Sequence, residues 1–124
     1  MEEAFIKSLL PQERVKEFFE AFYFGEEPAY DLELGLRGWE PEKGLLTLEL
    51  RLKARPGKCL ACNLTSGLPE VFKRHPILNL ARVAEEAVKG LGDGYRLRSW
   101  ELGWTEQVNR DLHVIPMIIR VEKG

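Results

Sequence analysis

The chain has 124 residues, 44% of them apolar, which predicts one domain over residues 1–124 with enough apolar side chains for a single core. Its 18 basic and 20 acidic residues give a formal net charge of -2, so nucleic acid is not the expected partner. No apolar run approaches the roughly 20 residues of a membrane-spanning helix, and the acidic start at Glu2 and Glu3 is unlike an export signal, so we expect a cytoplasmic protein without membrane contact.

The first elements that the sequence predicts are helices. Residues 2–9 can form a short helix, and Pro11 suits the first position of a longer one. Apolar residues of this second helix recur at steps of three and four, which gives it one apolar face. Gly25 and Pro28 are expected to end it. The apolar face consists of Val15, Phe18, Phe19 and Phe22.

Two strands are predicted next. Apolar and polar residues alternate over residues 30–37 and again over residues 46–53, which is the pattern of a strand with one wet face. Trp39 is expected to close the first strand, and residues 40–44 contain the proline and glycine of a turn. We therefore expect an antiparallel hairpin.

Two further helices are predicted in the middle of the chain. Pro69 can open a short helix that runs through Arg74, and Pro76 can open a longer one. Glycines at positions 90, 92 and 94 are expected to end the longer helix. Its apolar stripe consists of Ile77, Leu80, Val83, Ala84, Ala87 and Val88.

The last third of the chain predicts a second hairpin, with strands over residues 95–104 and 112–121 and a polar turn over residues 105–111. The apolar residues of the first strand change phase, which predicts either a bulge near residues 98–99 or a strand covered on both faces. Pro116 predicts an edge position or a bulge in the second strand.

Together these elements predict an α+β fold in the order α-β-β-α-α-β-β. We expect a four-stranded, mainly antiparallel sheet of two hairpins with helices packed on one face. Trp39, Trp100 and Trp104 are expected to add apolar area to the opposite face. A second copy of the chain would cover such an area, so we expect a homodimer.

The paired cysteines Cys59 and Cys62 are the motif that carries chemistry. Two thiolates at this spacing can hold one metal ion or close into a disulfide, because a tight turn brings both sulfur atoms to one side. In a reducing compartment such a pair more often binds metal or exchanges electrons than cross-links a fold. We expect zinc or another thiophilic metal ion in a structural role.

Two histidines are available to complete a tetrahedral site. His75 follows Cys62 after twelve residues, the gap of a Cys2His2 finger, but Asn79 stands where that finger has its last histidine. The candidate ligands are Cys59, Cys62, His75 and His113, or the cysteine pairs of two chains. Each histidine also has a structural alternative, His75 at a helix end and His113 inside a strand.

Three alternatives to metal binding stay open. The cysteines can form a thiol–disulfide exchange site, with Lys58 and Arg55 lowering a thiol pKa, although Gly67 and Pro69 interrupt the chain where a thioredoxin-type site continues as a long helix. The chain can instead be a non-catalytic interaction module, or the cysteines can be small buried apolar groups. The sequence contains no phosphate-binding loop, nucleophile elbow or zinc-protease helix.

Residues 59–76 read CLACNLTSGLPEVFKRHP. This segment is similar to one in a small family of uncharacterised bacterial proteins, some of which carry the label pancreas/duodenum homeobox protein. The resemblance implies no established fold, activity or catalytic residue. The label itself does not fit this chain, because a homeodomain is a basic three-helix unit whose last helix enters the major groove.

Overall fold

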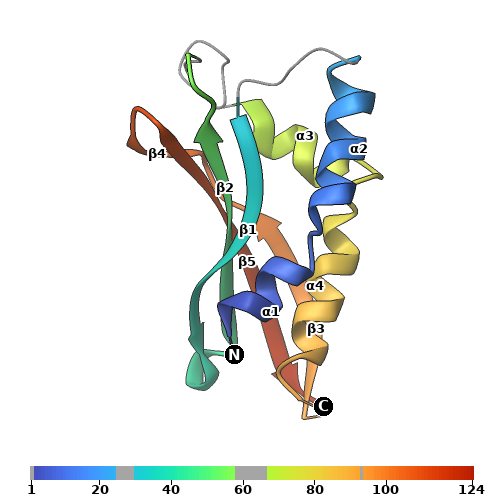
Figure 1. Cartoon of the computed structure of the whole chain (residues 1–124). Coiled ribbons are helices and arrows are strands. Elements are labelled where there is room, and N and C mark those ends of the chain that lie inside the picture. Colours follow the sequence, from blue (N-terminus) through green and yellow to red (C-terminus); the bar gives the residue numbers. More distant parts are fainter. Residues whose placement is uncertain (1, 25–29, 58–66, 93) are drawn as a thin grey trace.

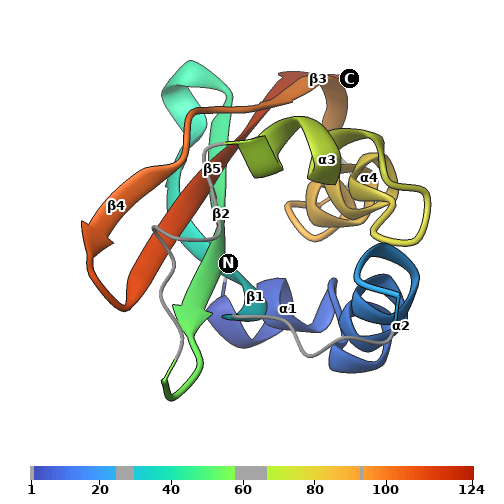
Figure 2. The ribbon, with the colours of Figure 1, turned by 90° about the horizontal axis from the view of Figure 1, so that it is seen from above.

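The structure is a computed structural model that describes residues 2–24, 30–57, 67–92 and 94–124. Within these ranges five strands form one antiparallel sheet, and four α-helices lie on one of its faces (Figures 1 and 2). The predicted α+β class and antiparallel sheet are confirmed. The predicted number of four strands is wrong, because the described residues contain a fifth.

Two helices open the chain, as the sequence predicts. Helix α1 (Glu3–Ser8) buries Ile6, and helix α2 (Gln12–Phe22) buries Phe18 in the middle of its apolar face. Pro11 lies immediately before α2 with extended backbone and does not occupy the first helical turn. Both helices thus direct apolar side chains into a core that they share with the sheet.

The predicted hairpin is confirmed. Strand β1 (Tyr30–Glu40) pairs antiparallel with strand β2 (Leu45–Ala54), and a 3₁₀ turn, η1 (Pro41–Lys43), leads into the connection between them. Alternate residues of β2 point toward the helices, as expected for a strand with one buried face. These residues, all fully buried, are Leu46, Leu48, Leu50 and Leu52.

The two middle helices are present, but one begins later than predicted. Helix α3 (Leu68–Arg74) confirms the short predicted helix. The longer helix, α4 (Leu80–Lys89), does not begin at Pro76. Asn79 precedes it in left-handed conformation with φ of 45°, and its side chain accepts a hydrogen bond from the Arg82 backbone N–H at 3.4 Å. The asparagine cap therefore defines the start of the helix.

The remaining strands are β3 (Tyr95–Leu102), β4 (Glu106–Asn109) and β5 (Leu112–Lys123). Their order in the sheet is β1-β2-β5-β3, with β4 also paired to β5. The sequence predicts a polar turn where β4 lies. All residues of β4 are exposed, so their polarity gives no sign of a strand. The strand forms because its backbone pairs with the first residues of β5.

The predicted bulge in β3 is confirmed by a shift of register between Leu97 and Ser99. The extra residue places Tyr95 and Leu97 on the same face as Trp100 and Leu102. All four side chains pack, partly buried, against the core. The change of phase in the sequence therefore marks one covered face, not two.

Pro116 lies inside the sheet, because β5 pairs with β2 on one side and with β3 and β4 on the other. The predicted edge position is therefore wrong. The Pro116 carbonyl accepts a hydrogen bond from the Gly103 N–H at 2.8 Å, so the proline nitrogen also faces the side of β3 and β4. At that point β3 has ended at Leu102 and β4 has not begun. The missing N–H thus interrupts no pairing there.

The three tryptophans do not gather on the face opposite the helices. Trp39 is the register partner of Leu46, and Trp100 is the register partner of Ile119. Both partners belong to the core, and both tryptophans pack against it. Trp104 is the one of the three that is exposed. The prediction of an apolar outer face built from tryptophans is therefore wrong.

Gly44 and Gly57 provide a matched test of the hairpin geometry. Both have positive φ, 61° and 76°, but a Cβ at Gly44 would lie 2.5 Å from the Val121 carbonyl oxygen, whereas one at Gly57 would meet nothing within 4 Å. We expect both alanine substitutions to lose about 1 kcal/mol of unfolding free energy through backbone strain. Gly44→Ala should lose about 1–3 kcal/mol more through the clash with β5. Equal losses in urea denaturation would contradict this close approach.

Candidate functional site

The paired cysteines, Cys59 and Cys62, and the neighbouring Lys58 lie outside the described residues. Strand β2 ends at Ala54, and the next described element, α3, begins at Leu68. The motif therefore belongs to the connection between the second strand and α3. Of the four predicted metal ligands, His75 and His113 lie within the described residues, and their positions can be compared with the prediction.

His113 lies at the end of the sheet from which this connection departs. It is the second residue of β5, and its register partners are Leu52 of β2 and Gln107 of β4. The Ala54 N–H donates a hydrogen bond to the Asp111 carbonyl at 2.8 Å, which holds the last residue of β2 beside the start of β5. Strand pairing thus positions His113 near the point where β2 leads toward the cysteines.

His113 is 2% exposed. Among the described residues it is the only polar or charged one that is buried. Burial lowers the pKa of His113, because the charged imidazolium form is poorly solvated in this position. The ring is therefore neutral at neutral pH. A neutral imidazole is the form of histidine that binds metal ions.

His75 has different surroundings. It follows α3 directly, and its ring meets the Phe18 ring edge to face, with 4.8 Å between the ring centroids. Its Nδ1 accepts a hydrogen bond from the Ile77 backbone N–H at 3.3 Å. In the neutral ring this leaves the proton on Nε2. His75 thus supports the turn between α3 and α4 by packing on the aromatic face of α2.

The described residues contain no group of three or more histidine, cysteine, aspartate or glutamate side chains that could hold a metal ion. Because both cysteines lie outside those residues, the predicted set of Cys59, Cys62, His75 and His113 stays a prediction. The structure places the two histidines in separate environments, His113 on the inner face at the start of β5 and His75 beside α2.

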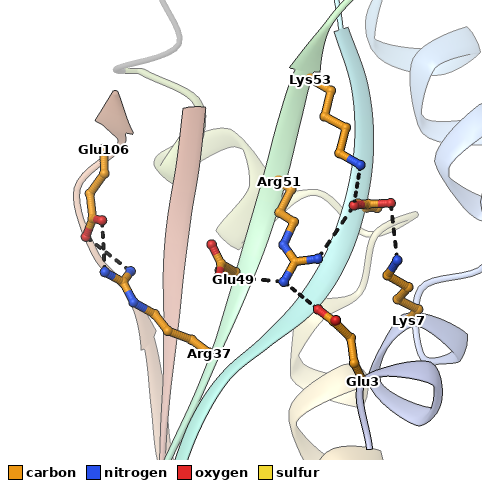
Figure 3. A network of polar contacts seen from close by, with 8 residues as sticks. Glu3, Lys7, Arg37, Glu49, Arg51, Lys53 and Glu106 are labelled. Atoms are coloured by element: carbon orange, nitrogen blue, oxygen red, sulfur yellow. Dashed lines mark hydrogen bonds and ion pairs between the residues drawn. The ribbon is translucent and has the colours of Figure 1, made fainter. Parts of the chain in front are cut away.

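The outer face of the sheet, away from the helices, carries a network of charged side chains (Figure 3). Arg51 of β2 lies at its centre. Its guanidinium contacts the Glu3 carboxylate of α1 and lies 3.7 Å from Glu33 and 3.8 Å from Glu49. A Cβ at Gly35 would overlap this guanidinium. The glycine in β1 therefore allows Arg51 to lie flat across the neighbouring strand.

Two lysines complete the network. Lys53 lies 2.8 Å and Lys7 lies 3.9 Å from the Glu33 carboxylate. Burial acts to raise the pKa of Glu33, but the hydrogen bond from Lys53 and the charges of Lys53, Lys7 and Arg51 outweigh it and lower the pKa. The hydrogen bond from Arg51 lowers the pKa of Glu3. Three carboxylates and three cations balance, so the network favours neither an anionic nor a cationic ligand.

A second ion pair joins two strands that are not neighbours. Arg37 of β1 donates two hydrogen bonds, of 3.0 Å and 3.2 Å, to the Glu106 carboxylate of β4 (Figure 3). Strands β2 and β5 lie between them, which in a flat sheet would separate the backbones of β1 and β4 by about 14 Å. The sheet therefore curves toward this face. Val114, which lies on the outer face of β5, is only 4% exposed.

Sequence reasoning missed this network, although part of the signal is present. Glu33, Arg51 and Lys53 all fall on the predicted wet faces of the first hairpin. The contacts of Glu3 with Arg51 and of Arg37 with Glu106 join residues 48 and 69 positions apart. No local pattern marks such pairs. We interpret the network as a device that holds α1 and β4 to the sheet.

Comparisons of the chain with protein-family models, with curated proteins and with solved structures find no match. The resemblance of residues 59–76 to a bacterial family therefore stays a prediction. None of the helices in the described ranges has the length and apolar character needed to cross a membrane.

The lowered pKa of Glu33 predicts a specific dependence of stability on pH. The charged form stabilises the fold above the ordinary glutamate pKa of about 4.3, and this contribution is lost as pH falls through the lower folded-state value. Glu33→Gln should therefore cost roughly 1 kcal/mol at pH 7 and less at pH 3, as measured by urea denaturation at each pH. Glu42→Gln, in the exposed turn η1, is the control. A Glu33→Gln difference that is constant with pH would contradict the assignment.

Proposed function

We propose that the protein binds a thiophilic metal ion, zinc in the first instance, through Cys59, Cys62 and His113. The role of the ion is structural. The observation that supports this proposal is the buried, neutral His113 at the sheet end where β2 leads into the cysteine segment. A buried imidazole without charge is a suitable third ligand beside two thiolates.

A closed structural zinc site needs a fourth ligand. His75 is the candidate from the same chain, but while Nδ1 accepts the Ile77 N–H the proton lies on Nε2, so binding through Nε2 would require the proton to move to Nδ1 and this hydrogen bond to break. The alternative is a ligand from a second copy of the chain, as in a site shared across a symmetry axis. Measuring the ratio of metal to protein distinguishes the two arrangements.

Metal binding would give the connection between β2 and α3 a folding role. Each ligand must lose or lack a proton to bind, so the affinity should fall as the pH decreases. Because the ion binds the folded chain and a preformed site does not exist in the unfolded chain, binding would add to the free energy of unfolding. This role fits a small domain with a single core.

Thiol–disulfide exchange has less support. Arg55, which the sequence offers as a cation to lower a thiol pKa, lies 3.0 Å from the Asp31 carboxylate, so its charge is partly neutralised. The homodimer also stays a proposal, but the apolar tryptophan face that suggested it is absent from the described part of the outer face. Sedimentation of the purified protein tests it.

We expect protein purified without chelator to contain zinc in a stoichiometric amount by elemental analysis. Cys59→Ser should lose the metal, because a hydroxyl is a poor zinc ligand, and His113→Gln should weaken binding by a factor of ten or more. Substitution with cobalt(II) should give the absorption of cobalt–thiolate bonds in the wild type and not in Cys59→Ser.

The control for the histidine assignment is His75→Gln. Loss of metal in both histidine variants supports the four-ligand set within one chain, whereas loss only in His113→Gln supports a shared site. Thermal unfolding of each variant with excess chelator shows whether a substitution acts through the metal or through the fold. Absence of metal in the wild type, together with no uptake of zinc or cobalt, would overturn the proposal.

A further inference from the structure

Trp104 differs from the other two tryptophans because its side chain lies on the surface. Its side chain is 88% exposed, whereas Trp39 and Trp100 pack partly buried against the core. An indole has a large apolar surface, and leaving it in water forgoes the stabilisation that burial gives. Exposed tryptophans of this kind are common at the centres of binding surfaces.

The backbone around Trp104 is held firmly to β5. The Gly103 N–H donates a hydrogen bond to the Pro116 carbonyl at 2.8 Å, and a Cβ at Gly103 would lie 2.8 Å from Pro116 Cγ. Two residues after the tryptophan, Glu106 pairs with Val114. The indole is therefore carried on a short segment that is fixed at both ends. A backbone segment fixed in this way loses little conformational freedom on binding.

Trp104 forms one wall of a cleft between the end of β3 and the first turn of α3. The cleft has a volume of about 260 Å³ and is lined by Leu102, Gly103, Trp104, Pro69 and Glu70. Pockets that enclose small-molecule ligands usually have volumes of roughly 300–1,000 Å³. The size of this cleft suits a single long side chain better than a whole cofactor or metabolite.

The chemistry of the lining defines which side chain fits. Indole, proline and leucine groups offer apolar walls, and the Glu70 carboxylate offers a negative charge. Glu70 already pairs with Arg74 on the next turn of α3, at 3.6 Å, but both side chains are largely exposed, at 74% and 81%. Such a surface pair is weak and can exchange for another cation.

We propose that this cleft binds an arginine side chain of another polypeptide. A guanidinium group can stack on the indole face and at the same time donate two hydrogen bonds to a carboxylate, whereas a lysine ammonium has no planar face to stack. The partner is thus a protein that presents an exposed arginine. This proposal does not rest on the proposed metal site.

The test uses ¹⁵N-labelled full-length protein and follows the indole N–H signals of the three tryptophans by NMR. The Trp104 signal is assigned from its disappearance in Trp104→Phe. N-acetyl-argininamide should shift the Trp104 signal in a saturable way and leave those of Trp39 and Trp100 in place. N-acetyl-citrullinamide, a neutral isostere, should bind at least about fivefold more weakly, because it cannot make the cation–π contact or the ion pair.

Three variants locate the carboxylate. Glu70→Gln should weaken arginine binding about threefold or more, and Arg74→Gln should strengthen it, because Arg74 competes for Glu70. Glu86→Gln is the matched control, since Glu86 also pairs with an arginine four residues away, Arg82 of α4, far from the cleft lining. It should leave binding unchanged. Equal binding of arginine and citrulline, no shift of Trp104, or no effect of Glu70→Gln would each overturn the proposal.

Discussion

The fold depends on the burial of one row of leucines. Leu46, Leu48, Leu50 and Leu52 of β2 are fully buried beneath the helices, opposite the equally buried Ile115, Met117 and Ile119 of β5. Burying each such side chain contributes roughly 1.5–3 kcal/mol. A slip of one residue would exchange this row for the polar and charged residues between them, so the row also fixes the register of the central strands.

The same register determines the outer face. Because the leucines point inward, Glu49, Arg51 and Lys53 must point outward, where Arg51 meets the glycine gap in β1. Their charges are balanced by Glu33 and by residues of α1. Sheets twist because of backbone sterics, and the curvature of this sheet brings Arg37 to Glu106. The outer face is thus a stabilised charged surface, and the arginine binding that we propose lies elsewhere, near Trp104.

Much of the scaffold could be predicted from the sequence, because the decisive signals are local. The alternation in the first hairpin, the aromatic face of α2 and the change of phase at residues 97–99 each describe one element. The rest depended on distant residues. Strand β4 has no apolar pattern and exists through its pairing with β5, and Asn79 overrides Pro76 at the start of α4 through a single cap. At the candidate site, the spacing of the sequence does not encode the tertiary contacts that place His113 beside Leu52 of β2 and His75 beside α2.

The position of β5 in the sheet has a consequence for how the domain forms. It comes last in the chain among the described strands, but it occupies the middle of the sheet between β2 and β3. During folding, the β1–β2 hairpin can form early because its residues are close in sequence. The leucine face and the edge of β2 stay uncovered until β5, about 60 residues further along the chain, pairs with β2. An unpaired edge with an apolar face invites association with other chains. Docking of the preceding helix α2 on that face would shorten this exposure.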